Sequence, residues 1–109
     1  MTTFVKPLEF AQGRNDKPYK HTFLATERIL VGMNCLQIGQ AQPLHDHPAQ
    51  DKFYYVLEGT GHFTVGEETR ECAAGELILC PAGVAHGVEN RGIGLVSFLT
   101  VIAPWEKAG

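Results

Sequence analysis

The amino-acid sequence predicts an all-β fold. Twelve glycines and six prolines interrupt the 109 residues at short intervals. The runs between them are short and rich in aromatic, β-branched and other apolar side chains. No window of about a dozen residues carries the i, i+3, i+4, i+7 apolar spacing of a helix. Short strands at near-regular spacing are typical of a β-sandwich or a β-barrel.

Turn-forming residues set the limits of the expected elements. Residues 1–20 form an N-terminal arm and loop, in which the best helical candidate, residues 7–12, is very short. The following runs end at glycine- or proline-containing turns such as Gly39, Gly66 and Pro81-Ala82-Gly83. No composition shift marks a second domain, so we expect one domain over residues 1–109. The expected strands are residues 21–26, 28–38, 53–57, 62–65, 76–80, 84–89 and 95–102.

Composition and charge exclude several classes of protein. The sequence is 44% hydrophobic and 19% charged, which argues against disorder. Nine Lys and Arg against twelve Asp and Glu disfavour nucleic-acid binding. The apolar stretch at residues 95–103 is about half as long as a membrane helix, and the first residues show no secretory signal. Three cysteines without a C-x-x-C pair favour reduced thiols, so we expect a cytoplasmic protein with no membrane partner.

Three histidines occur in a pattern suited to metal binding. His45 and His47 form an H-x-H pair, and on a strand residues i and i+2 point to the same face, about 7 Å apart. His86 follows the Pro81-Ala82-Gly83 turn and falls early on the next expected strand. Three imidazoles that converge from two strands can ligate one divalent transition metal such as Fe, Mn, Ni or Zn.

The two histidine segments resemble the sequence motifs of the cupin superfamily. The first, residues 39–59, is similar to G-x5-H-x-H-x(3,4)-E-x6-G, and the second, residues 75–90, to G-x5-P-x-G-x2-H-x3-N. The resemblance implies a small, RmlC-like jelly roll, in which a double-stranded β-helix forms a barrel around the histidines. The matching residues are Gly39, His45, His47 and Gly59 in the first motif and Gly75, Pro81, Gly83, His86 and Asn90 in the second.

One position departs from the cupin pattern. Counting back from Gly59 places Lys52 where the family has its glutamate ligand. Three interpretations follow: a three-histidine site completed by water or substrate, a site in which Asp51 or Gln50 is the fourth ligand, or a metal-free pocket that contains Lys52. Alternation along the strand also makes Tyr54 a pocket candidate, and Gln37 would be another if its face points inward.

The preferred interpretation is a small cupin that binds a divalent transition metal through His45, His47 and His86 inside the barrel. The resemblance implies that such a site would suit a dioxygenase, an isomerase or a lyase acting on a small polar substrate, and it leaves open whether the protein is an enzyme. The alternative is a binding module without catalytic activity, in which a metal-free barrel captures a sugar or an organic acid and Lys52 pairs with an anion. We also expect a homodimer, because the arm and the final strand carry apolar side chains that one barrel cannot bury on both faces.

Overall fold

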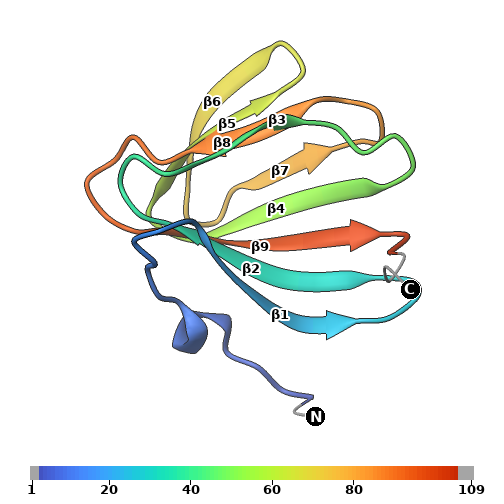
Figure 1. Cartoon of the computed structure of the whole chain (residues 1–109), viewed down its shortest axis with the longest axis horizontal. Helices are drawn as coiled ribbons and strands as arrows, with labels where there is room; N and C mark the ends of the chain where they lie inside the picture. The colour runs from blue at the N-terminus through green and yellow to red at the C-terminus, as the bar shows by residue number, and fades with distance from the viewer. Residues whose placement is uncertain (1–2, 106–109) are drawn as a thin grey trace.

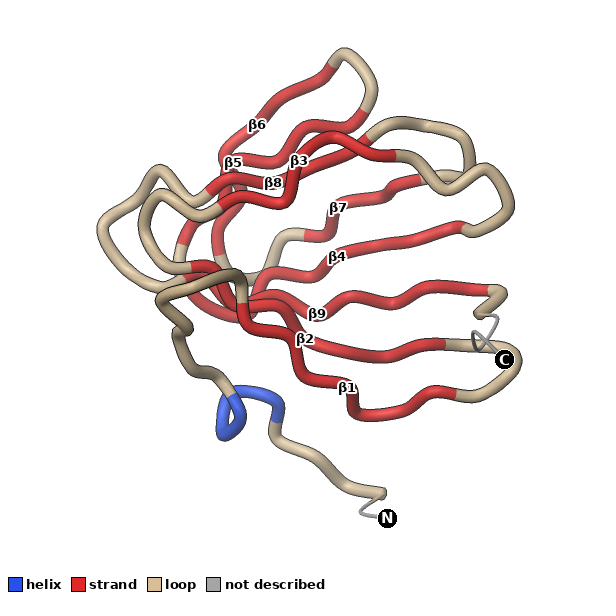
Figure 2. The backbone as a smooth tube through the Cα atoms, in the orientation of Figure 1, coloured by secondary structure: helices blue, strands red, loops and turns tan. Residues whose placement is uncertain are grey.

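The computed structural model describes residues 3–105, and its strands form two facing sheets (Figures 1 and 2). Within these residues the order of the five-stranded sheet is β1-β2-β9-β4-β7, and that of the four-stranded sheet is β3-β8-β5-β6. All pairings are antiparallel. The elements are a 3₁₀ helix η1 (Pro7–Phe10) and the strands β1 (Tyr19–Ala25), β2 (Leu30–Leu36), β3 (Ala41–His45), β4 (Asp51–Glu58), β5 (Thr60–Val65), β6 (Glu68–Ala73), β7 (Leu77–Cys80), β8 (His86–Glu89) and β9 (Val96–Ala103).

The all-β prediction is confirmed, and the arrangement is a jelly roll in which the two sheets are not closed into one hydrogen-bonded barrel. Strands β1 and β3 are the edges of different sheets, and no ladder of hydrogen bonds joins them in the described part of the chain. The space between these two edges is therefore open to solvent, and it becomes important for the site below. In residues 3–105, no helix is long and apolar enough to cross a membrane.

The sequence analysis did not predict two of the strands, β3 and β6, and both lie at sheet edges. Strand β3 contains Pro43, which cannot donate a ladder hydrogen bond and is tolerated at an edge, where the pairing with β8 is irregular. Strand β6 is charged and largely exposed, as is common for edge strands that avoid further pairing. Neither strand has the alternating apolar pattern from which buried strands are predicted.

The core lies between the sheets and is built from alternate residues of the strands. Side chains of Tyr54, Val56 and Phe98 are fully buried there, and the two aromatic rings meet edge to face. On β4, the side chains of Lys52, Tyr54 and Val56 therefore point inward, as the sequence predicts. The buried cluster comprises Leu36, Tyr54, Val56, Phe63, Cys72, Ile78, Cys80, Val88, Val96 and Phe98.

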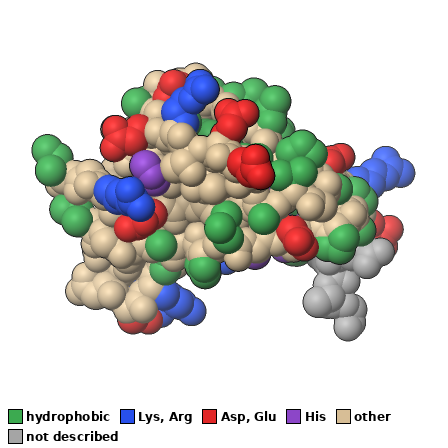
Figure 3. Space-filling view, turned by 90° about the horizontal axis from the view of Figure 1, so that it is seen from above, with side chains coloured by type: hydrophobic (Ala, Val, Ile, Leu, Met, Phe, Trp, Pro, Cys, Tyr) green, Lys and Arg blue, Asp and Glu red, His purple; other side chains and the backbone are tan. Residues whose placement is uncertain are grey.

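The N-terminal arm folds onto the outer face of the five-stranded sheet. Phe10 stacks on His21 with ring centroids 4.7 Å apart and meets Phe23 edge to face at 5.5 Å. Val5 lines a cleft together with Leu99 on the outer face of β9. The arm thus covers the β1 side of this face with side chains of the same chain. The opposite side of the molecule, shown in Figure 3, mixes acidic, basic and apolar side chains.

Candidate metal centre

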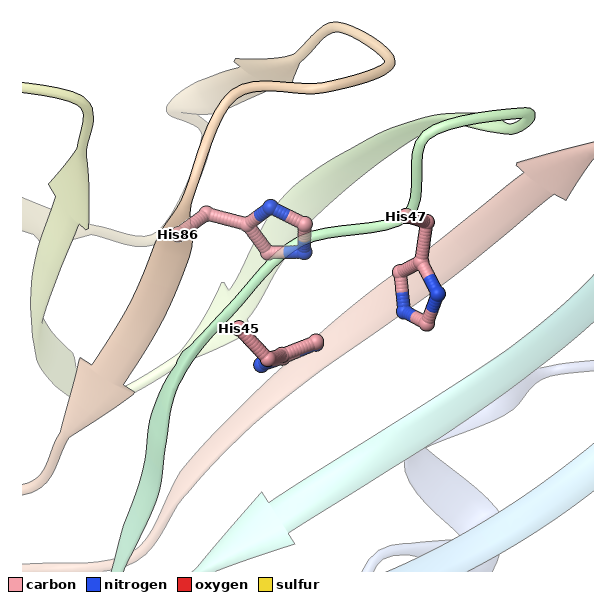
Figure 4. Close-up of side chains that lie close together, drawn as sticks. All are labelled: His45, His47 and His86. Atoms are coloured by element: carbon pink, nitrogen blue, oxygen red, sulfur yellow. The ribbon is translucent and has the colours of Figure 1, made fainter.

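The structure brings the three predicted histidines together. His45 on β3 lies directly opposite His86 on β8, and His47 reaches the same space from the loop after β3 (Figure 4). One nitrogen from each ring lies within 4.8 Å of the other two. Ring centroids are 4.5 Å apart for His45 and His86 and 5.0 Å apart for His45 and His47. Since metal–nitrogen bonds are about 2.1 Å long, small rotations of the rings suffice to bring all three around one ion.

Backbone carbonyl groups orient two of the rings through Nδ1, which leaves Nε2 of each ring as the nitrogen that can act as a ligand. Nδ1 of His45 lies 2.8 Å from the carbonyl oxygen of Pro43, and Nδ1 of His86 lies 3.0 Å from that of Val84. A carbonyl oxygen can only accept, so each Nδ1 carries the proton and each Nε2 keeps its lone pair. In the described part of the chain, Nε2 of His86 is buried without a hydrogen-bond partner. A buried lone pair of this kind fits a metal ligand that is oriented by its second nitrogen.

The local electrostatics also favour neutral imidazoles. Burial lowers the pKa of His86, and the nearby Lys52 ammonium lowers it further, while the hydrogen bond to Val84 acts in the opposite direction. The pKa of His47 is lowered by burial and then by Lys52. Because only a neutral imidazole can ligate a metal, these shifts extend the range of pH in which the site can bind one.

The turn before His86 is tied to the loop that carries His47. Gly83 adopts a φ of 80°, which a residue with a Cβ rarely adopts, and its N–H donates to the carbonyl oxygen of His47 over 3.1 Å. Oδ1 of Asp51 accepts a hydrogen bond from the N–H of Ala82 over 2.9 Å. These two contacts hold the second histidine segment against the first. The spacing of the Pro81-Ala82-Gly83 turn therefore has a direct role in placing His86.

Neither candidate for a fourth ligand joins the histidine cluster. Asp51 is engaged by the turn at Ala82, and Nε2 of Gln50 donates to the carbonyl oxygen of Pro104 over 2.9 Å. Among the described residues, the only group of metal-ligating side chains is the three-histidine cluster itself. This arrangement favours the three-histidine interpretation over one with a carboxylate ligand from the loop.

Lys52 occupies the space beside the histidines. Its Nζ lies 3.5 Å from Nε2 of His45 and 3.4 Å from the hydroxyl oxygen of Tyr54. The lysine side chain is about half buried, and burial is the main cause that lowers its pKa, with repulsion from Lys20 acting in the same direction. Burial raises the pKa of the Tyr54 hydroxyl, which therefore stays protonated. Tyr54 shares the inner face of β4 with Lys52, as the alternation predicts, but its side chain is fully buried in the core and is not among the residues that line the cavity described below.

Gln37 lies away from this space. Strand β2 directs Asn34 and Leu36 into the interior, which leaves Gln37 on the other face, where its side chain lies against Gly13. The prediction that Gln37 lines the pocket depended on the face it occupies, and the structure places it on the outer one. Asn34 is the inward polar residue of this strand, and its amide donates to the hydroxyl of Thr100.

A cavity of about 920 Å³ opens between β1 and β3 and leads to His45, His47 and Lys52. Lys20 and Thr22 from β1 line one wall, because their alternation points them toward the four-stranded sheet. The sequence analysis missed these residues, although the same alternation on β1 could have identified them once the inward face was known. Leu30, Ile102 and Trp105 form an apolar part of the wall.

A comparison with family models matches residues 32–102 to the cupin domain. The chain is a cupin. It is 39% identical over 79 residues to an uncharacterized protein of Streptomyces coelicolor, and the match covers 72% of this cupin and 73% of that protein. The solved structure of TT1209 from Thermus thermophilus has a TM-score of 0.90 and 36% identity, and the match covers 94% of this cupin and 98% of that chain.

Two further matches, one to a sequence and one to a solved structure, carry names that refer to oxalate. An oxalate-binding protein of Thermotoga maritima is 33% identical to this cupin over 64 residues, which are 59% of this chain and 53% of that protein. A structure described as a predicted oxalate decarboxylase, also from Thermotoga maritima, has a TM-score of 0.78 at 23% identity and covers 93% of this cupin and 98% of that chain. This second likeness shows the fold alone.

Proposed function

We propose that this cupin holds one divalent transition metal through His45, His47 and His86, and that the metal acts on a small polar molecule. The observation that carries the proposal is the buried Nε2 of His86, which has no hydrogen-bond partner among the described residues and faces the other two imidazoles. Three neutral ligands leave the ion its full charge and open coordination positions, so it would supply Lewis acidity or bind oxygen. A dioxygenase, an isomerase or a lyase would all use such a centre.

The protein's own groups have separate tasks in this site. The carbonyl oxygens of Pro43 and Val84 fix the ring orientation of His45 and His86 by accepting from Nδ1. The Lys52 ammonium places polar hydrogens on the wall of the cavity, and the buried Tyr54 hydroxyl contacts this ammonium from the core. The apolar side chains of Leu30 and Ile102 displace water from the part of the cavity that a substrate's carbon atoms would occupy.

A second candidate function is a metal-free binding module. The observation in its favour is Lys52 itself, because an ammonium 3.5 Å from a ligand nitrogen opposes a divalent ion and would pair with an anion instead. In this case the cavity captures an organic acid or a sugar and performs no reaction. Metal content separates the two candidates.

The test is the metal content of the purified protein after equilibration with Fe(II), Mn(II), Ni(II) or Zn(II). We expect about one ion per chain, and we expect His86→Ala and His47→Ala to lose it. His62→Ala is the matched control, since His62 lies on β5 away from the cluster and should leave the metal content unchanged. Equal metal content in the wild type and the two site variants would contradict the metal centre. Oxygen consumption with a set of small substrates then separates oxygenases from the other reaction classes.

A further inference from the structure

The charge of the cavity differs from that of the rest of the molecule. The sequence has a formal net charge of −3, yet the described residues that line the cavity include Arg14, Lys17, Lys20 and Lys52 and no Asp or Glu. Arg14 is already neutralised, because it forms an ion pair with Asp16 at 2.7 Å. In residues 3–105, no carboxylate is within 4.0 Å of the three lysines. By contrast, the face in Figure 3 has interspersed charges of both signs.

The inner end of this cavity has an excess of positive charge once a metal is bound. The three imidazoles are neutral ligands, and Lys52 takes the position where an acidic ligand would offset the charge of the ion. Repulsion between an ammonium and a divalent ion in a partly buried site is substantial even after solvent screening. The site is therefore electrostatically incomplete until an anion lies between the two cations.

The remaining walls indicate what kind of anion fits. Leu30, Ile102 and Trp105 provide apolar surface in the same cavity as His45, His47 and Lys52. An inorganic anion would leave this surface in contact with water, whereas a sugar would place hydroxyl groups against it without partners. A carboxylic acid with a short carbon chain pairs its carboxylate with the lysines and places its carbon atoms against the apolar wall. The cavity volume of about 920 Å³ accommodates such a molecule.

We infer that the substrate or ligand is a small carboxylate, that Lys52 is the residue which selects it, and that carboxylate and metal bind cooperatively. This inference rests on the proposed metal centre. The carboxylate charge lies between the ion and the Lys52 ammonium and relieves the repulsion between them, while Lys20 attracts the anion at the opening. Because linkage is reciprocal, the carboxylate raises the affinity for the metal by the same factor by which the metal raises the affinity for the carboxylate.

Calorimetric titration of the metal-free protein with Mn(II), with and without malonate, tests the inference. We expect malonate to raise the Mn(II) affinity at least about fivefold, and we expect neutral malonamide to have no effect. Malonate also binds free Mn(II), which lowers the apparent affinity, so an increase can come only from the complex of protein, metal and anion. Lys52→Met should abolish the increase, and Lys20→Met should reduce it.

The matched control is Lys6→Met, because Lys6 is an exposed lysine of the N-terminal arm outside the cavity. It should keep the full effect of malonate. The inference is overturned if Mn(II) binds in a histidine-dependent way and malonate fails to raise its affinity, or if Lys52→Met keeps the increase. If Mn(II) binding is absent or unaffected by His86→Ala, the metal centre itself fails, and the two failures are thereby distinguished.

Discussion

Nζ of Lys52 lies 3.5 Å from Nε2 of His45, the ring nitrogen that is not bonded to the carbonyl oxygen of Pro43. An ammonium about 4 Å from a divalent ion is repelled by roughly 8 kcal/mol at an effective dielectric constant of 20, and screening at this half-exposed site reduces that value. The lysine therefore weakens metal binding without removing any ligand. Its effect on the metal is the opposite of that expected for an acidic side chain at the same position.

Replacement of Lys52 should accordingly tighten metal binding in the absence of added anions. We expect Lys52→Met to increase the Zn(II) affinity about tenfold, which corresponds to about 1.4 kcal/mol, because the repulsion is removed. Lys52→Glu should increase it further by adding a carboxylate ligand. Competition titration with a chromophoric chelator measures both values. An unchanged affinity in both variants would show that the Lys52 side chain turns away from the bound metal.

The three histidines of the site could be identified from the sequence, because their spacing from each other and from the Pro81-Ala82-Gly83 turn is local. The two-residue spacing of His45 and His47 and the turn before His86 both act over a few residues, although β3 ends at His45 and His47 lies in the loop that follows rather than on the same strand. The all-β class followed in the same way from turn residues and short apolar runs. The meeting of His86 with His45, by contrast, depends on the pairing of β3 with β8.

Features that depend on long-range neighbours could not be predicted. Asp51 is a candidate ligand by its spacing from His47, but its carboxylate bonds to Ala82, a residue 31 positions further along the chain. Gln37 has no local signal that distinguishes the inner face of β2 from the outer one. The opening between β1 and β3 exists because both are edge strands, and the charged wall formed by Lys20 depends on that tertiary arrangement.

Asp51 should contribute to stability through the turn. Asp51→Ala leaves the N–H of Ala82 without its carboxylate partner, and we expect it to lower the free energy of unfolding by about 1 kcal/mol. Asp51→Asn keeps an acceptor oxygen and should cost less. Urea denaturation measures both changes. The metal content should stay at the wild-type level in both variants, and its loss in Asp51→Asn would instead identify Asp51 as a ligand.

The stability of the metal-free protein should fall as the pH is lowered through the histidine range. The folded state lowers the pKa values of His47 and His86, chiefly by burial, below the value of about 6.5 in the unfolded chain. Below pH about 6.5 the unfolded chain thus binds more protons, and the free energy of unfolding decreases until the folded-state pKa values are passed. Urea denaturation of the wild type and of His86→Gln at several pH values isolates the contribution of His86. The free energy of unfolding of His86→Gln should decrease less between pH about 6.5 and 5 than that of the wild type. An identical decrease in the two proteins would contradict a contribution from His86.

An apolar patch on the outer face of β4 and β7 gives the predicted homodimer a specific surface. Phe53 lies opposite Leu79 and Tyr55 opposite Leu77, and the exposed fractions of Phe53, Leu79, Tyr55 and Leu77 are 36%, 62%, 38% and 54%, respectively. The sequence analysis based the dimer on the arm and the final strand. The arm instead lies against β1 and β9 of its own chain, which leaves the β4–β7 patch as the uncovered part of that face.

We therefore expect Leu79→Asp to convert the dimer to a monomer, because a charge at the centre of this patch must be desolvated when two copies meet. Sedimentation velocity at micromolar concentration should give about 24 kDa for the wild type, twice the chain mass of 12.0 kDa, and about 12 kDa for the variant. Ile93→Asp is the matched control, since Ile93 is 99% exposed in the loop before β9 and outside the patch. Its mass should equal that of the wild type. A wild-type mass of about 12 kDa would contradict the predicted homodimer. A dimeric Leu79→Asp protein would show that the interface lies outside the β4–β7 patch.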